Sequence, residues 1–145
     1  MTIRLSVLVV LAVAAMGSAQ AAGYDPIETR QAGQDLLAGT FNGIKALSAT
    51  KGDMKTIEAS AKSMARWITQ FPSQFPKGSE QGHNTKALPV IWTDSAGFEK
   101  AAQELATASN KLAELAKAGD ADGVAAQIKV VGDACASCHK NFRAR

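Results

Sequence analysis

Cysteine and aromatic residues are scarce in this chain of 145 residues: there are two cysteines, and Phe, Trp and Tyr together make up 6% of the sequence. Two cysteines can form at most one disulfide, which excludes a fold held by a disulfide framework. The net charge is only +3, and no basic patch is interleaved with aromatic residues. We therefore expect one globular domain with its own core and no nucleic-acid partner.

The one long apolar run lies at the N-terminus. Arg4 precedes a run that ends at Met16, and small residues around Ala21 form an A-x-A pattern. A basic start, a short apolar segment and a small-residue cleavage site are typical of a secretory signal peptide. The run is also shorter than the roughly 20 apolar residues of a membrane-spanning helix. We expect residues 1–21 to be removed on export, leaving residues 22–145 in a bacterial periplasm without a membrane anchor.

The rest of the chain is rich in alanine and poor in β-branched runs, which favours helices. Apolar residues recur every three or four positions in four segments, and capping residues mark the ends of these segments. The expected helices run from Pro26 after Asp25 to about Lys51, from Asp53 to before Pro72, from Thr93 or Asp94 to about Lys117, and from Asp120 or Asp122 to about Phe142. Narrow apolar stripes of this kind pack between nearly antiparallel helices. An all-α fold, an antiparallel four-helix bundle, is therefore predicted, with residues 72–92 as its long connection.

The two cysteines lie near the C-terminus in a C-x-x-C-H sequence, as Cys135, Cys138 and His139. Helical spacing places both thiols on the core-facing stripe of the last expected helix. Four kinds of site contain such a pair: a disulfide, half of a zinc site, a redox dithiol and a haem attachment site.

The setting of the motif separates these four alternatives. A disulfide between cysteines three residues apart would restrict little of the unfolded chain. Zinc needs about two further ligands, and beyond His139 only His83 is available. A thioredoxin-like dithiol belongs to a βαβ unit, which this chain lacks. The motif in an exported helical protein favours covalent haem c, with thioethers from Cys135 and Cys138 and His139 as the iron ligand.

The chain resembles the cytochrome c′ family, the class II c-type cytochromes. The resemblance rests on three segments: YDPIETRQAG (24–33), LPVIWTDSAGF (88–98) and VGDACASCHKNFRAR (131–145). It implies a periplasmic four-helix bundle with one covalent haem, whose iron has His139 as its fifth ligand. It also implies that Arg143 lies near the proximal haem face, and that Arg30 and Gln31 lie near the haem and its propionates.

One position departs from the family pattern. Members usually carry a bulky apolar residue or a methionine over the distal haem face, where this chain has Gln34. Gln34 is also polar in an otherwise inward-facing stripe. Because a buried amide needs hydrogen-bond partners, Gln34 either bonds a neighbouring helix or points outward, or its amide faces the iron and contacts a bound diatomic gas or a water.

Two branches of the family differ in the sixth iron ligand. Low-spin members use a methionine of the first helix and carry electrons, whereas high-spin members leave the position open and bind nitric oxide and carbon monoxide. The mature chain has only Met54 and Met64, both in the second expected helix. We expect both to pack in the core, with Met64 a minor ligand candidate. The prediction is therefore a five-coordinate, high-spin haem protein. The first alternative is a low-spin electron carrier, because the segment FPSQFPKG (71–78) resembles the low-spin members more closely. The second alternative is a purely structural bundle.

The remaining expectations concern partners and chemistry. No nucleophile–base pair and no paired carboxylates indicate an enzyme active site, so no enzymatic activity is expected. His83 is expected to be exposed in a polar loop, with Trp67 and Trp92 as core or pocket walls. The expected partners are small diatomic gases, a redox protein and, because members often dimerise through the first two helices, a second copy of the chain.

Overall fold

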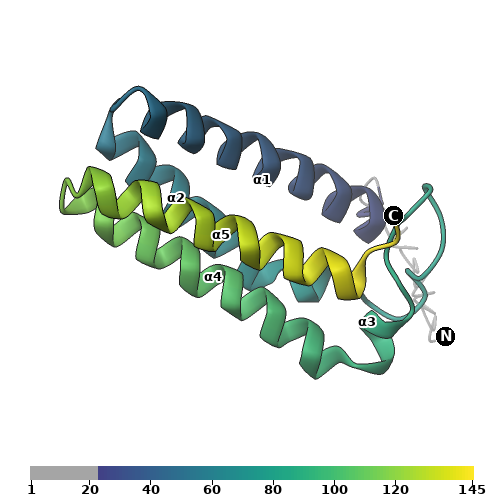
Figure 1. Ribbon diagram of the computed structural model, residues 1–145. Coiled ribbons are helices and arrows are strands. Elements are labelled where there is room, and N and C mark those ends of the chain that lie inside the picture. Colours follow the sequence, from purple (N-terminus) through teal and green to yellow (C-terminus); the bar gives the residue numbers. More distant parts are fainter. Residues whose placement is uncertain (1–22) are drawn as a thin grey trace, which may run out of the picture.

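The computed structural model describes residues 23–145, so the expected signal peptide lies outside the described residues. In this part of the chain all regular elements are helical: α1 (Pro26–Ala49), α2 (Met54–Gln70), the 3-10 turn η1 (Phe71–Gln74), α3 (Val90–Thr93), α4 (Ser95–Lys117) and α5 (Ala121–Phe142). Figure 1 shows the four long helices side by side, with the connection between α2 and α4 at the same end as the C-terminus. The predicted four-helix bundle is confirmed. None of the helices described is long and apolar enough to span a membrane.

Aspartates cap all four long helices. Asp25, Asp53, Asp94 and Asp120 each accept hydrogen bonds from backbone N–H groups in the first turn of the helix that follows. These N–H groups have no partner within the helix, which is why a carboxylate at this position stabilises the helix start. Where the sequence left two candidates for the third and fourth caps, the structure selects Asp94 and Asp120.

The core is continuous through the four long helices. Its most deeply buried large side chains are Ile44, Ile57, Met64, Leu112, Val124 and Val131, each at most 2% exposed. At the end of the bundle where the C-terminus lies, aromatic rings surround Phe98. Its ring centroid lies 4.8 Å from that of Phe75 and 5.2 Å from that of Phe142. Burial of these side chains is the main driving force for the fold.

Helix α1 packs closely on α2 at Gly33. A Cβ atom at Gly33 would lie only 1.9 Å from Cζ2 of Trp67, so glycine is what allows the helix to approach the indole ring. Trp67 therefore packs between α1 and α2 against the buried core, which is the core role expected for it and not that of a pocket wall.

The connection between α2 and α4 is more ordered than the sequence indicated. The predicted loop 72–92 contains two short helical turns, η1 and α3, each with a proline at or next to its start, where a fixed φ suits a helix. The connection then pairs with the C-terminus. Ala87 forms an antiparallel bridge with Arg143, and backbone hydrogen bonds join Leu88 N to Phe142 O at 3.0 Å and Ala144 N to Lys86 O at 2.8 Å.

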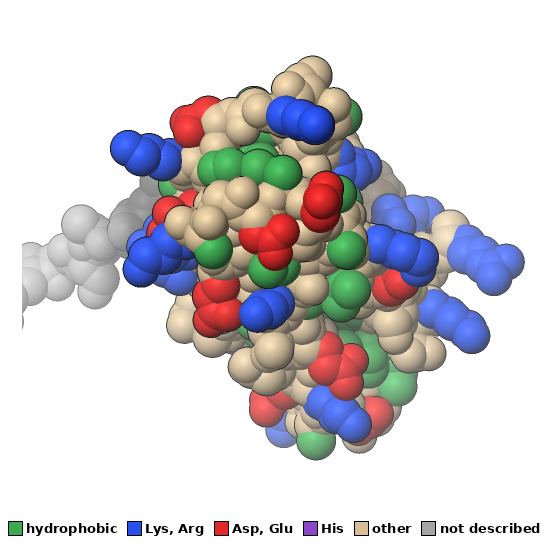
Figure 2. Space-filling view, turned by 60° about the vertical axis from the view of Figure 1, so that its left-hand side comes forward, with side chains coloured by type: hydrophobic (Ala, Val, Ile, Leu, Met, Phe, Trp, Pro, Cys, Tyr) green, Lys and Arg blue, Asp and Glu red, His purple; other side chains and the backbone are tan. Residues whose placement is uncertain are grey.

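The opposite end of the bundle shows a mixed surface. Figure 2 looks towards the end where the α1–α2 and α4–α5 turns lie, and acidic, basic and hydrophobic side chains are interspersed on it. Among residues 23–145, this face therefore offers no concentrated charge of one sign that would attract an oppositely charged partner.

Candidate functional site

A cavity of about 660 Å³ lies within the bundle. This volume falls in the range of roughly 300–1,000 Å³ that is common for small-molecule and cofactor sites. The walls come from α1 (Gln34, Leu37, Phe41), α2 (Met64, Ile68), α4 (Phe98, Leu105), α5 (Cys135, Cys138, His139) and the 85–87 segment, among others. Most of the lining side chains are apolar, and the polar ones lie on α1, in the loop, and at or just after the C-terminal end of α5.

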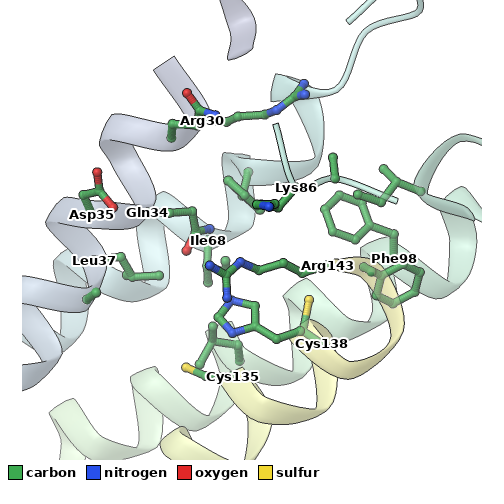
Figure 3. Close-up of a pocket in the computed structure, with 18 of the residues that line it drawn as sticks. Arg30, Gln34, Asp35, Leu37, Ile68, Lys86, Phe98, Cys135, Cys138 and Arg143 are labelled. Carbon is green, nitrogen blue, oxygen red and sulfur yellow. The ribbon is translucent and has the colours of Figure 1, made fainter. Parts of the chain in front are cut away.

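Cys135 and Cys138 are free thiols on the α5 wall of this cavity. Their spacing places them about one helical turn apart, as Figure 3 shows. Burial raises the pKa of both thiols, and for Cys138 burial together with the neighbouring Cys135 raises the pKa to about 11. Residues 23–145 contain no cluster of three or more His, Cys, Asp or Glu side chains suited to a metal ion, so the zinc alternative lacks its ligands here.

His139 lines the same cavity directly after Cys138. Partial burial and the positive charge of Arg143 both lower the pKa of the imidazole. A lowered pKa favours the neutral ring, whose unprotonated nitrogen can bind a metal. Arg143 follows one turn later, where its backbone N–H donates to His139 O at 3.1 Å, and its side chain also lines the cavity. The structure thus brings together the two residues that the resemblance places on one side of a haem.

Arg30 touches the cavity, but its guanidinium is directed towards the connection between α2 and α4. The residue is 3% exposed. Nη1 donates to Gln74 O at 3.2 Å and to Ser79 Oγ at 2.9 Å, and Nη2 donates to Ser79 O at 2.7 Å and to Thr85 Oγ1 at 3.1 Å. The group also lies 4.4 Å from the centre of the Phe75 ring. Both terminal nitrogens therefore hold the loop, and Figure 3 shows the group directed away from the two cysteines.

Gln31 and His83 meet at the outer edge of the same loop. Gln31 Nε2 donates to His83 O at 3.0 Å. The His83 ring is exposed, as predicted, with Nε2 at 3.0 Å from Asp25 Oδ2 and Nδ1 at 3.4 Å from Glu28 Oε1. The amide of Gln31 is thus used to hold the loop against the start of α1.

Gln34 points into the cavity, on the wall opposite Arg143 in Figure 3. Within residues 23–145 no hydrogen bond joins its amide to another residue. Of the arrangements considered from the sequence, the structure therefore favours the one in which the amide faces the cavity rather than a neighbouring helix. Leu37 and Phe41 follow at helical spacing and continue the same wall.

Some cavity residues were not identified from the sequence. Lys86 reaches the cavity from an aperiodic loop, and only the pairing of that loop with the C-terminus brings it there. Met64, expected to be a core residue and a minor ligand candidate, is 2% exposed and lines the cavity, whereas Met54 is not among the lining residues.

The residues present fit a covalent haem c. Two free thiols one helical turn apart, an adjacent imidazole and a largely apolar cavity are the groups that such a cofactor requires. Together they provide two attachment points and one nitrogen ligand, and the α1 wall lies across the cavity from them.

Comparison with known proteins agrees with this site. The family model for cytochrome C' matches residues 25–143. Cytochrome c' of Rubrivivax gelatinosus is 33% identical over 121 residues, covering 82% of this chain and 94% of the relative. A solved cytochrome c' described as having an unusual ligand-controlled dimer dissociation superposes with a TM-score of 0.77 at 31% identity, covering 86% of this chain and all (100%) of that one. The nitric oxide complex of a variant of cytochrome c prime from Alcaligenes xylosoxidans superposes with a TM-score of 0.73 at 28% identity, covering 83% of this chain and 94% of the other. With its fold, its C-x-x-C-H site and these similarities in agreement, the chain belongs to the cytochrome c′ family.

Proposed function

We propose that this c-type haem protein has a five-coordinate, high-spin iron held by His139 and that it binds small diatomic gases such as nitric oxide and carbon monoxide. The cavity carries the proposal: Cys135, Cys138 and His139 on α5 face Gln34 across it, and α1 contains no methionine. The family carries one covalent haem c, which when bound supplies an iron able to change oxidation state and to bind gases.

The two thiols attach the cofactor in this proposal. Each thiol adds across a vinyl group, so that a carbon–sulfur bond forms and the thiol hydrogen ends on the neighbouring carbon, with no oxidant consumed. Replacing both residues, Cys135→Ser with Cys138→Ser, should leave a protein whose haem is fully removed by acidic organic solvent. Retention of haem in the protein fraction after that extraction would contradict the assignment.

On the opposite wall, Gln34 would act on the bound gas. Its carboxamide is a poor iron ligand beside an imidazole or a thioether, but its N–H group can donate a hydrogen bond to a diatomic ligand. Leu37, which is 8% exposed, and Phe41 line the same wall and leave little room for larger ligands. Gln34 thus supports the binding of a diatomic gas, and Leu37 and Phe41 support selection for small ligands.

A low-spin electron carrier is the second candidate, and Met64 favours it. This side chain is buried and lines the cavity, and a methionine thioether is an established haem ligand. Against this assignment, Met64 also belongs to the buried cluster of α2 and α4, in the role of a core side chain. Its replacement therefore separates the two candidates.

The test is the absorption spectrum of the ferrous holoprotein with and without carbon monoxide. The proposal requires a broad high-spin Soret band that shifts sharply with carbon monoxide, and Met64→Leu should leave this spectrum unchanged. A split low-spin α band that carbon monoxide does not alter, and that Met64→Leu converts to a high-spin spectrum, would establish the electron carrier instead.

Export and assembly complete the proposal. We propose that residues 1–21 direct export to the periplasm, which N-terminal sequencing of the mature protein would test. The protein would also exchange electrons with a redox protein and form a homodimer through α1 and α2. Leu36, an α1 side chain that is 73% exposed, offers an apolar contact for that dimer. Leu36→Lys should then shift the sedimentation coefficient from that of a dimer to that of a monomer, and a monomeric parent protein would contradict the assignment.

A further inference from the structure

The charged side chains that line the cavity are mostly positive. Among residues 23–145 these are Arg30, Lys86, Arg143 and one carboxylate, Asp35. A haem carries two carboxylate groups of its own, the propionates. Carboxylates that leave bulk water need cationic or hydrogen-bonding partners. The question is which of these cations is available to them.

Arg30 and Arg143 are less available to a propionate, because the first has other hydrogen-bond partners and the second lies beside His139. Arg30 uses both terminal nitrogens on Ser79, Thr85 and Gln74. Arg143 lies one helical turn after His139, and its backbone N–H donates to His139 O at 3.1 Å. The amide of Gln31, which the resemblance places near the propionates, donates to the His83 carbonyl.

Lys86 differs from both. Within the described chain, no ion pair or hydrogen bond joins its ammonium group to another residue, and Figure 3 shows the side chain entering the cavity from the loop side, across from Gln34. The chain is held at Lys86 and at the residue before it. Lys86 O accepts a hydrogen bond from Ala144 N at 2.8 Å, and the neighbouring Thr85 hydroxyl accepts from Arg30 at 3.1 Å.

From this arrangement we propose that Lys86 binds a propionate carboxylate of the haem, and that Arg30 positions Lys86 by holding Thr85. The inference rests on the proposed function, because it needs haem in the cavity. It assigns the carboxylate contact to a loop residue instead of the Arg30–Gln31 pair of α1. It also gives the pairing of the loop with the C-terminus a role, since this pairing places Lys86 and Arg143 on the same rim.

The experiment uses the haem-loaded mature protein and compares Lys86→Gln with Lys117→Gln. Lys117 is an exposed residue in the last turn of α4, at the opposite end of the bundle, so both variants lose one positive charge. Lys86→Gln should shift the propionate bending band in the resonance Raman spectrum. It should also lower the midpoint potential, because loss of a nearby positive charge favours the ferric form.

Lys117→Gln should change neither the Raman band nor the potential, and Lys86→Arg should restore most of both. A Lys86→Gln variant that matches Lys117→Gln in both measurements would overturn the inference. The amount of covalent haem in the parent protein tells the two hypotheses apart. Absence of covalent haem refutes the proposed function, whereas covalent haem with an unaffected propionate band refutes only the assignment of Lys86.

Discussion

Replacement of Arg30 by glutamine should be among the most destabilising single changes in a polar residue of this protein. Arg30 is 3% exposed and makes four hydrogen bonds to the connection between α2 and α4. The two hydroxyl acceptors lose less than the two carbonyls. Ser79 Oγ still donates to Pro76 O at 2.8 Å, and Thr85 Oγ1 still accepts from Ala87 N at 3.3 Å.

The main loss comes from the two carbonyl acceptors, Gln74 O and Ser79 O. A buried polar group left without its partner costs about 1–3 kcal/mol. Loss of the guanidinium over the Phe75 ring adds about 0.5–1 kcal/mol. Because the new amide can replace one of the hydrogen bonds, we expect the free energy of unfolding to fall by about 3 kcal/mol. For a domain of this size that corresponds to a fall in Tm of roughly 12 °C.

Equilibrium urea unfolding of the haem-loaded protein, followed by circular dichroism, measures this loss. Arg66→Gln is the matched control, because Arg66 is an exposed arginine of α2 whose one side-chain hydrogen bond within the described chain, to Ser63 Oγ, is long at 3.4 Å. The control should change the free energy of unfolding by less than about 0.5 kcal/mol. If Arg30→Gln and Arg66→Gln lose the same stability at equal haem content, Arg30 does not hold the loop and the reasoning is wrong.

Three further changes test other parts of the structure. Gln34→Leu removes a donor from the cavity, so nitric oxide or carbon monoxide should dissociate about three- to tenfold faster in stopped-flow measurements, and an unchanged rate would return Gln34 to a structural role. Gly33→Ala places a Cβ 1.9 Å from Trp67 Cζ2 and should cost about 1–3 kcal/mol in urea unfolding, whereas Gly43→Ala, with nothing within 4 Å of its Cβ, should stabilise by about 0.5–1 kcal/mol; equal effects would contradict the close approach. Hydrogen bonds from the Thr56 side chain and from the backbone of the first α2 turn lower the pKa of Asp53 from 3.8, so its stabilising contribution is complete above that pH and is lost as the pH falls through the folded value. Asp53→Asn keeps a capping side chain without this titration and should flatten the acid limb of stability against pH; an acid limb as steep as that of the parent protein would rule this out.

The bundle itself could be predicted because its signals are local. Helical periodicity and the aspartate caps depend on residues within a few positions of one another, and Asp25 and Asp53 occupy the predicted cap positions. Gln34 could be singled out for the same reason, since its place in an apolar stripe follows from helix geometry alone. The cysteine motif was informative because its three side chains lie within five consecutive residues.

The loop between α2 and α4 could not be predicted in the same way. The pairing of Ala87 with Arg143 joins segments far apart in the sequence, and no periodic pattern marks either of them. The direction of the Arg30 guanidinium depends on that loop, because carbonyl and hydroxyl groups of the loop are its acceptors. Consequently the sequence indicated which residues of α1 lie at this end of the bundle, but not that Lys86 joins them at the cavity.

The cavity takes up space that side chains fill in most helical bundles, so the molecule that occupies it becomes part of the core. A ligand held by affinity alone stabilises a protein by an amount that falls as its free concentration falls. Thioether bonds from Cys135 and Cys138 remove that dependence, because the occupant cannot leave when the protein is diluted. The integrity of the bundle then becomes a property of the single molecule and no longer depends on how far the protein is diluted.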